Sequence, residues 1–315
     1  MPCTATHARR LGVAAPSTGS RTHNDGIAFI REPVLSRLSN SISRALIAGA
    51  VSLMIAGGAA AKGPVVRPVK VMVITLFGPE AAPWLAQLPL KRTIRVPGLS
   101  AEYPEVRCTD SGVCLMTTGM GHANAAASTM ALALSPQFDL SHTYFVVTGI
   151  AGIDPNVGTL GAAAWARYLV DFGLQQEFDA REAPAGWDTG YVGIGAADPG
   201  TRPKLEYGTE VFQLDEALLQ RALALSRGAR LEDNATYEAL RRGAAAGRLD
   251  LHRVAVLRTG ANFDRPHPGQ TAQESLNAQS GGFPISTANL VHAAWPLVSD
   301  IVARWPQWRE GVPRQ

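Results

Sequence analysis

The chain is poor in cysteine and has no second long apolar run after its first 61 residues. Three of its 315 residues are cysteine, and no Cys and His residues have the spacing of metal ligands. Residues 62–315 carry 23 basic and 24 acidic residues. This balance argues against a nucleic acid as partner, because binding to phosphates needs clustered Lys and Arg. The single apolar run excludes a carrier built from several membrane-spanning helices.

Residues 1–61 have the composition of a secretory leader. Arginines precede the apolar run 45–61, which ends in three alanines. This order predicts a signal peptide that is cleaved before Lys62 and an exported, periplasmic protein. An uncleaved membrane anchor is the alternative, and the length of the leader also allows translation to start downstream, for example at Met54.

Two of the cysteines flank a predicted turn. Cys108 and Cys114 lie symmetrically about Ser111, so that a hairpin there would place them opposite each other. In an oxidising compartment they would form a disulfide. Two small buried thiols are the alternative, and the sequence does not decide between them.

Strands alternate with helices along residues 62–315. We expect strands at 70–77, 92–96, 106–109, 113–118, 144–148, 162–170 and 252–259, and helices at 81–87, 122–134, 214–225, 233–246 and 286–304. Residues 184–210, rich in Gly, Pro and aromatic residues, predict a surface loop region. The alternation predicts one α/β domain, with a mixed or mostly parallel central sheet flanked by helices.

Two glycine-rich segments follow predicted strands. Residues 118–124 (TGMGHAN) place a Gly-x-Gly turn before a helix, where free N–H groups suit an anion or a sugar hydroxyl. Residues 149–152 (GIAG) follow the strand 144–148, and we expect them to form a turn with a bare backbone. Open α/β sheets bind ligands at the carboxyl ends of such strands, and we expect the two segments to lie side by side there. The first segment is not a dinucleotide fingerprint, because Asn124 replaces its third glycine.

Both segments together resemble the nucleoside phosphorylase and nucleosidase superfamily, and further motifs resemble one family more closely. These motifs are FGPEAAPW, TGIAGIDP, AAWARYLVDFGLQQE, REAPAGW, EDNATYEALRRGA, VLRTGANFDRP and GFPISTANL. With them the chain resembles the purine nucleoside permease family over most of residues 69–313. The resemblance implies a nucleoside phosphorylase-like fold, purine nucleosides as ligands and no cofactor, with phosphate as a co-substrate if the protein is an enzyme.

The resemblance also implies roles for single residues. Gly119 and Gly121 match the turn that meets the phosphate or ribose. The turn that flanks the base is matched by Thr148, Gly149, Ala151 and Gly152. Glu232 falls near the acidic motif that holds ribose hydroxyls, and Asn262 lies where an Asp or Asn bonds the purine edge. Glu80 and Asp264 would be catalytic, because Glu80 matches a residue that helps to activate water in the hydrolytic members and Asp264 lies just beyond Asn262.

Each role has a purely structural alternative. Glu232 suits a helix cap, Asn262 an Asx turn, and Glu80 a favourable contact with a helix dipole. Arg258 and Arg265 are candidates for contact with an anion, or for pairing with surface acids. Further candidates are His122 as a pocket-wall or solvent residue, and Trp84, Trp165 and Trp187 as rings that stack on a base, although core packing suits Trp165 better.

One segment of the family is missing. Family members usually carry a strand and a Trp-His-Gly stretch between the helix at 214–227 and the EDNAT motif. Here residues 228–230 run directly into 231–233. A missing central strand would leave a gap in the sheet with unpaired backbone groups.

Three functions follow from the resemblance. The first is a protein that binds purine nucleosides and supports their transport across a membrane, together with a membrane partner. The second is an enzyme that cleaves the N-glycosidic bond with phosphate or water, with the charge of the transition state stabilised by the site. The third is a relative that keeps only the fold. A homo-oligomer is expected because superfamily relatives oligomerise.

Overall fold

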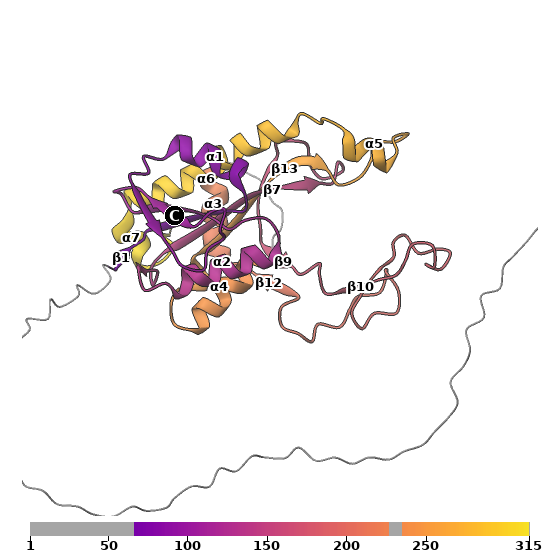
Figure 1. Ribbon diagram of the computed structural model, residues 1–315, viewed down its shortest axis with the longest axis horizontal. Coiled ribbons are helices and arrows are strands. Elements are labelled where there is room, and N and C mark those ends of the chain that lie inside the picture. The colour runs from indigo at the N-terminus through magenta and orange to yellow at the C-terminus, as the bar shows by residue number, and fades with distance from the viewer. Residues whose placement is uncertain (1–65, 227–234, 315) are drawn as a thin grey trace, which may run out of the picture. The chain divides into compact units, whose positions relative to one another are not determined.

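The computed structural model describes residues 66–226 and 235–314 (Figure 1). The predicted leader, Glu232 and the junction between residues 230 and 231 lie outside these ranges. The strands are β1 (Arg67–Pro68), β2 (Val71–Thr75), β3 (Arg92–Arg95), β4 (Glu105–Cys108), β5 (Val113–Thr117), β6 (Phe138–Asp139), β7 (Tyr144–Ile153), β8 (Ala163–Trp165), β9 (Tyr168–Val170), β10 (Gln175–Glu177), β11 (Tyr191–Gly193), β12 (Val211–Gln213) and β13 (Val254–Phe263). The helices are α1 (Gly78–Gln87), α2 (His122–Leu134), α3 (Glu216–Ser226), α4 (Ala235–Ala245), α5 (Ala272–Asn277), α6 (Gly282–Ala303), α7 (Trp305–Glu310) and a 3-10 turn, η1 (Leu251–Arg253).

A seven-stranded sheet with the order β3-β4-β5-β2-β7-β13-β8 forms the centre. Its four central strands β5, β2, β7 and β13 are parallel, and β3, β4 and β8 are antiparallel to their neighbours. The prediction of an α/β fold with a mixed, mostly parallel sheet flanked by helices is therefore confirmed. Within the described residues β13 pairs directly with β7, so this sheet has no gap.

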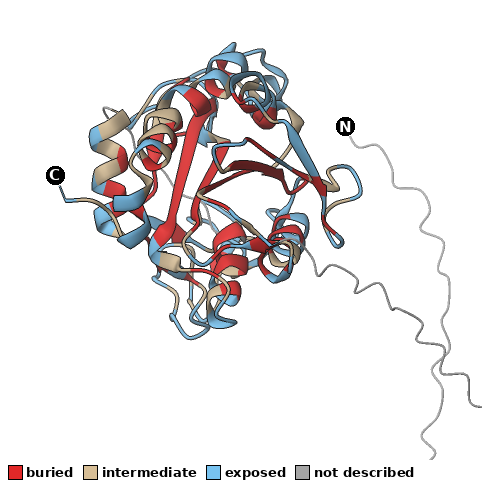
Figure 2. Cartoon of the chain, turned by 90° about the vertical axis from the view of Figure 1, so that its left-hand side faces the viewer, coloured by how far each residue is buried: buried red, intermediate tan, exposed pale blue. Residues whose placement is uncertain are grey.

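Helices cover both faces of the sheet, and the strands are buried between them (Figure 2). Val71 and Val73 of β2 belong to a core cluster with α1, α3, α6 and α7, whereas Met72 and Ile74 belong to a second cluster with α2 and α4. Because successive side chains of a strand point to opposite faces, this division fixes which side each strand residue occupies.

The carboxyl ends of β5, β2, β7 and β13 meet at one edge, because parallel strands end on the same side. We call this the carboxyl edge. Two residues separate the end of β2 from α1, and four residues separate the end of β5 from α2. The start of α6 is held against β13, since the Ser286 hydroxyl donates to the carbonyl of Gly260 and Thr259 Oγ1 donates to the carbonyl of Ser286.

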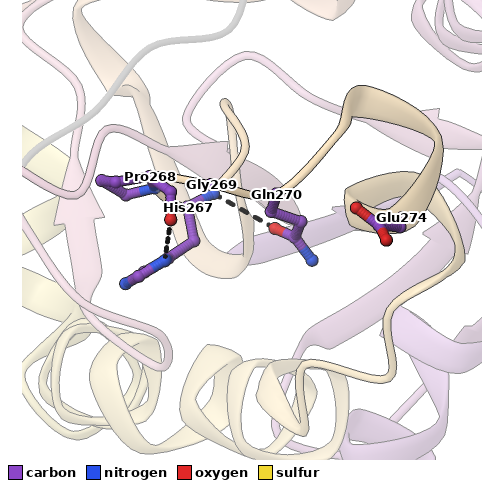
Figure 3. A pocket seen from close by; sticks show the side chains of 5 residues that line it. All are labelled: His267, Pro268, Gly269, Gln270 and Glu274. Atoms are coloured by element: carbon purple, nitrogen blue, oxygen red, sulfur yellow. Dashed lines mark hydrogen bonds between the residues drawn. The ribbon is translucent and has the colours of Figure 1, made fainter.

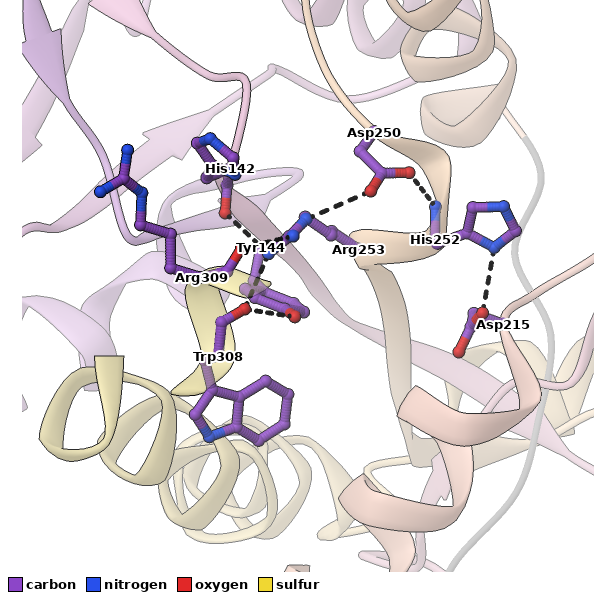
Figure 4. Close-up of polar contacts among 8 residues, drawn as sticks. All are labelled: His142, Tyr144, Asp215, Asp250, His252, Arg253, Trp308 and Arg309. Carbon is purple, nitrogen blue, oxygen red and sulfur yellow. Dashed lines mark hydrogen bonds and ion pairs between the residues drawn. The ribbon is translucent and has the colours of Figure 1, made fainter. Parts of the chain in front are cut away.

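At the opposite edge Arg253 fastens the C-terminal helix α7 to the sheet (Figure 4). Its guanidinium donates to the backbone carbonyls of Trp308 and Arg309 at 2.9 and 2.8 Å. The hydroxyl of Tyr144 donates to the same Trp308 carbonyl at 2.9 Å. Burial raises the pKa of that hydroxyl to about 12, so it remains a donor at any ordinary pH.

The antiparallel hairpin of β4 and β5 carries a disulfide between Cys108 and Cys114. Of the two states that the sequence left open, the structure has the bridged one. The pairing register places the two residues directly opposite each other, as the symmetry about Ser111 predicts.

Two expectations about the segment from Tyr144 to Val170 are wrong. Residues 149–152 form no turn but continue β7 to Ile153, because β13 extends equally far and supplies their hydrogen-bond partners. The predicted strand 162–170 is two short strands. Of these, β8 pairs with β13 and β9 pairs with β12, so neither forms a unit with β7.

Residues 171–210 form an excursion from the main body (Figure 1). It contains the hairpin of β10 and β11 but few buried side chains, in agreement with the loop region predicted for residues 184–210. Among the described residues, no helix combines the length and apolar character that crossing a membrane requires.

Candidate functional site

The two glycine-rich segments share the carboxyl edge but are not neighbours. The sheet order places β2 between β5, which leads to Gly119, and β7, which carries Gly149. Two strand spacings separate these strands by about 10 Å. The structure therefore corrects the expectation that the two segments lie side by side, although a ligand as long as a nucleoside spans this distance.

The segment after β5 is an open turn at the start of α2. Gly119 and Gly121 have φ values of 87° and 88°, which residues other than glycine rarely adopt. Gly121 precedes the first turn of α2, and no side chain caps it. Space around Gly121 is open, since a Cβ built there would meet nothing within 4 Å. The free N–H groups of this turn can donate hydrogen bonds to an anion or to a hydroxyl oxygen of a ligand. His122 is exposed to solvent.

Beside β7, Glu80 and Arg258 form a buried charged group that the glycine at position 149 makes possible. Arg258 lies on β13 in register with Gly149. A Cβ at position 149 would stand 1.5 Å from Arg258 Nη1 and 2.9 Å from Glu80 Oε1. The guanidinium of Arg258 thus occupies the space that a side chain at position 149 would take. This face of β7 is therefore not free for a ligand.

Both carboxylate oxygens of Glu80 accept hydrogen bonds from backbone N–H groups. Oε2 accepts from the N–H of Leu76 and Oε1 from the N–H of Ile150, each at 2.8 Å. The carboxylate therefore ties the end of β2 to β7. Burial raises its pKa, while the two backbone hydrogen bonds and the charge of Arg258 act in the opposite direction. Burial also lowers the pKa of Arg258 to about 10, against the attraction of Glu80.

Thr148 lies on the other face of β7 and is fully buried. Its Oγ1 accepts a hydrogen bond from Trp84 Nε1 at 3.1 Å. This side chain thus holds α1 on the sheet. Trp84 and Trp165 are buried in the core, so the expectation that Trp84 could stack on a base is wrong. Trp187 lies in the excursion, edge-to-face with Phe178.

The ends of β7 and β13 bring three of the predicted residues together. A bulge at Gly260 and Asn262 sets Asn262 opposite Gly152. A Cβ at Gly152 would lie 3.6 Å from both Asn262 Nδ2 and the Cβ of Asp264. Asn262 is exposed, and its Nδ2 donates to the carbonyl of Phe263 at 3.0 Å. Its amide oxygen and second N–H point to no partner that the structure gives, so this group can still meet the edge of a purine.

Asp264 and Arg265 form an exposed ion pair. Arg265 Nε donates to Asp264 Oδ1 at 2.9 Å, and Nη2 reaches Asp154 Oδ2 at 2.7 Å. The hydrogen bond from Arg265 lowers the pKa of Asp264. Asp264 is therefore ionised near neutral pH and has no proton to donate.

Neither of two hollows on the described surface contains a predicted site residue. One, of about 330 Å³, lies between α1 and the end of β5 and is lined by Gly78, Leu85, Tyr103, Arg107 and Thr117, among others. The other is a shallow, open hollow with a volume of about 540 Å³, on the loop before α5 (Figure 3). The side chains around it bond within that loop, as His267 Nδ1 does with the carbonyl of Pro268. We base the site on the strand ends and not on these hollows.

Two features of the site escaped the sequence analysis. The contact of Arg258 with Glu80 could have been found, because period two in VAVLRTG places Arg258 on the buried face with Val254 and Val256. The aromatic pair of Phe77 and Phe283, with ring centroids 6.3 Å apart, joins segments more than 200 residues apart. No local pattern indicates such a contact.

Comparison with known proteins places the chain in a family. The sequence model described as "Purine nucleoside permease (NUP)" matches residues 68–233 and 228–313. A purine nucleoside permease of Candida albicans is 33% identical over 306 residues, covering 75% of each chain. A protein of Schizosaccharomyces pombe described as a probable purine nucleoside permease is 31% identical, covering 84% of this chain and 98% of its own.

A solved structure, the 5'-methylthioadenosine/S-adenosyl homocysteine nucleosidase of Campylobacter jejuni, is similar at 15% identity and a TM-score of 0.46, covering 74% of this chain and 99% of its own. At this identity and score the likeness says nothing about what the present chain binds. The match to the family, by contrast, extends over most of the residues that form the sheet and its helices. The chain belongs to the purine nucleoside permease family.

Proposed function

We propose that this protein binds purine nucleosides at the carboxyl edge of its sheet and supports their transport across a membrane. Membership of the family supports the ligand class. The observation that carries the site is the end of β7 and β13, where Gly152 leaves the backbone bare beside the exposed amide of Asn262. An amide can donate to and accept from the edge of a purine at once.

The turn at Gly119 and Gly121 supplies the second half of this site. Its N–H groups, two strands away, would meet the ribose or an anion. The same site can hold phosphate if the ligand is cleaved. Glu232, which lies outside the described residues, remains the proposed contact to the ribose hydroxyls.

Binding is tested by titrating residues 62–315 with adenosine and inosine in a calorimeter. Asn262→Ala should weaken adenosine binding about tenfold, the cost of one or two lost hydrogen bonds in a partly dry site. Asn277→Ala, which removes an exposed amide from α5, is the matched control and should bind as the unsubstituted protein does. A protein that shows neither heat of binding nor a rise in melting temperature with nucleoside keeps the fold alone, which contradicts the proposal.

Cleavage of the N-glycosidic bond is the second candidate. It is favoured by Glu80, a carboxylate at the carboxyl edge whose pKa is raised by burial. Groups with such pKa values are frequent in catalytic sites. Incubation with adenosine, with and without phosphate, decides the matter by the free adenine released. Release that Glu80→Gln abolishes favours the enzyme, and tight binding without release favours the transport component.

We also propose that the mature protein is exported to the periplasm and works there with a membrane transport partner. The disulfide between Cys108 and Cys114 supports an oxidising compartment. N-terminal sequencing of the protein from a periplasmic fraction should find Lys62 as the first residue. A homo-oligomer is proposed as well, and its mass in solution tests it.

A further inference from the structure

Exposed apolar side chains gather where the parallel strands end. Phe77, which follows β2, is half-buried. Several of the apolar side chains that end or follow the other parallel strands, or that begin α6, are exposed: Met120, Val157, Phe263, Phe283 and Ile285. Scattered apolar residues are normal on a surface, but a group at one functional edge indicates a contact site.

Two of these residues form a pair across the end of β7. Phe77 ends the link from β2 to α1, and Phe283 lies in the first turn of α6. Their rings meet edge to face, with centroids 6.3 Å apart. Because β2 and β13 flank β7, and α6 starts against β13, the pair bridges the end of β7.

The start of α6 is fixed too firmly for Phe283 to be a loose surface side chain. A Cβ on Gly282 would stand 2.3 Å from the carbonyl oxygen of Ala261, so the helix begins in direct contact with β13. Phe283 nevertheless keeps 42% of its surface exposed. A ring that served only to pack α6 on α1 would be covered, whereas this ring presents one side outward.

The aromatic pair lies beside the part of β13 that carries Asn262. The carbonyl of Ala261 is in close contact with Gly282, the residue before Phe283, and the ring of Phe283 meets that of Phe77. The faces of a purine base are apolar, whereas its ribose is polar. Aromatic side chains bind bases by stacking on them.

We propose that Phe77 and Phe283 form an aromatic shelf on which the face of the purine base rests, with Phe283 as the residue in contact. This inference rests on the proposed binding of purine nucleosides at the carboxyl edge. It adds which side chain contacts the base.

Titration of full-length mature protein with adenosine, adenine and ribose tests the shelf. Phe283→Ala should weaken adenosine and adenine by the same factor, about tenfold or more, because stacking involves only the base. Phe283→Tyr keeps the ring and should bind within about twofold of the unsubstituted protein. Phe283→Leu keeps most of the apolar volume, so an equal loss with Leu and Ala at an unchanged melting temperature supports stacking over packing.

Phe178→Ala is the matched control. Phe178 is 43% exposed and also meets an aromatic ring edge to face, that of Trp187, but lies in the excursion. This variant should leave binding unchanged. Adenosine affinity that is the same in Phe283→Ala and the unsubstituted protein overturns the shelf alone, as does a loss for adenosine without a loss for adenine. An unsubstituted protein that binds no purine nucleoside overturns the proposed function and the shelf with it.

Discussion

At Gly149 the absence of a side chain leaves space for a buried charged group next to the candidate site. A glycine in a strand is usually a weakness, since it packs nothing and costs conformational entropy. Here the vacated volume receives the guanidinium of Arg258, which places a positive charge beside Glu80. The glycine-rich sequence that suggested room for a ligand therefore makes room on one face for the protein's own charge.

Gly149→Ala should destabilise the protein by about 3 kcal/mol, because the new methyl group displaces Arg258 and separates a buried charged pair. Urea unfolding of the two proteins measures the difference. Gly200→Ala is the control, since a Cβ there is in ordinary contact with Asp198, and should change the free energy of unfolding by less than about 0.5 kcal/mol. Equal stability of Gly149→Ala and the unsubstituted protein would show that Arg258 does not occupy this space.

Glu80 should make stability depend on pH in the direction opposite to that of a salt-bridged surface acid. Its folded-state pKa lies above the ordinary value of 4.5, so the folded protein holds the proton to higher pH than the unfolded chain does. The stability that this proton contributes is complete below pH 4.5 and is lost as the pH rises through the folded-state pKa.

Unfolding free energies of the unsubstituted protein and of Glu80→Gln, measured from pH 4 upward, test this linkage. The stability of the unsubstituted protein relative to that of the variant should fall with rising pH, because glutamine does not titrate. Glu206→Gln, which alters an exposed side chain, should run parallel to the unsubstituted protein. A gap between Glu80→Gln and the unsubstituted protein that stays constant over the range would refute the linkage.

The hairpin of β4 and β5 is cross-linked by the disulfide between Cys108 and Cys114. The bridge joins residues six positions apart, and so small a loop restricts the unfolded chain by about 2 kcal/mol. Reducing agent should lower the melting temperature by about 4 to 8 °C, given the size of the domain. Cys108→Ser with Cys114→Ser should melt at the reduced protein's temperature and no longer respond to the agent. A melting temperature that reduction leaves unchanged in the unsubstituted protein would contradict this role.

The sequence predicts which segments form elements better than which elements pair. Apolar runs and turn residues locate β2, β5 and α2 within a few residues, because those signals are local. The partner of β8 is β13, some ninety residues away, and nothing in the residues AAW of β8 indicates which strand they pair with. For the same reason residues 149–152 were expected to turn, since the strand that prolongs β7 comes from a distant part of the chain.

The candidate site was predictable only in part, because local motifs identify residues but not how the strands that carry them are ordered. Motifs located Gly119, Gly121, Gly152 and Asn262, and the structure places all four at the carboxyl edge. The separation of the two glycine segments by β2 follows only from sheet order. The sequence could not predict a role for Phe283, because this role depends on the contact with Phe77, more than 200 residues earlier in the chain.

For the whole molecule, the main division lies between the sheet with its helices and the excursion 171–210. The excursion buries few side chains, so its local opening costs little free energy. Trypsin should cut first after Arg181 and Lys204, both of which are exposed there, and mass spectrometry identifies the cuts. The nicked protein should still melt cooperatively near its original temperature. First cuts within β2, β7 or β13 would contradict this division.

The close fit of Arg258 above Gly149 has a consequence for how the family can vary. The two positions sit on different strands, about a hundred residues apart, yet they occupy a single volume. A relative with alanine or serine at the first position has no space for a guanidinium from the second. Across related proteins the two positions should therefore change together, so that a larger residue at one is accompanied by a shorter, uncharged residue at the other.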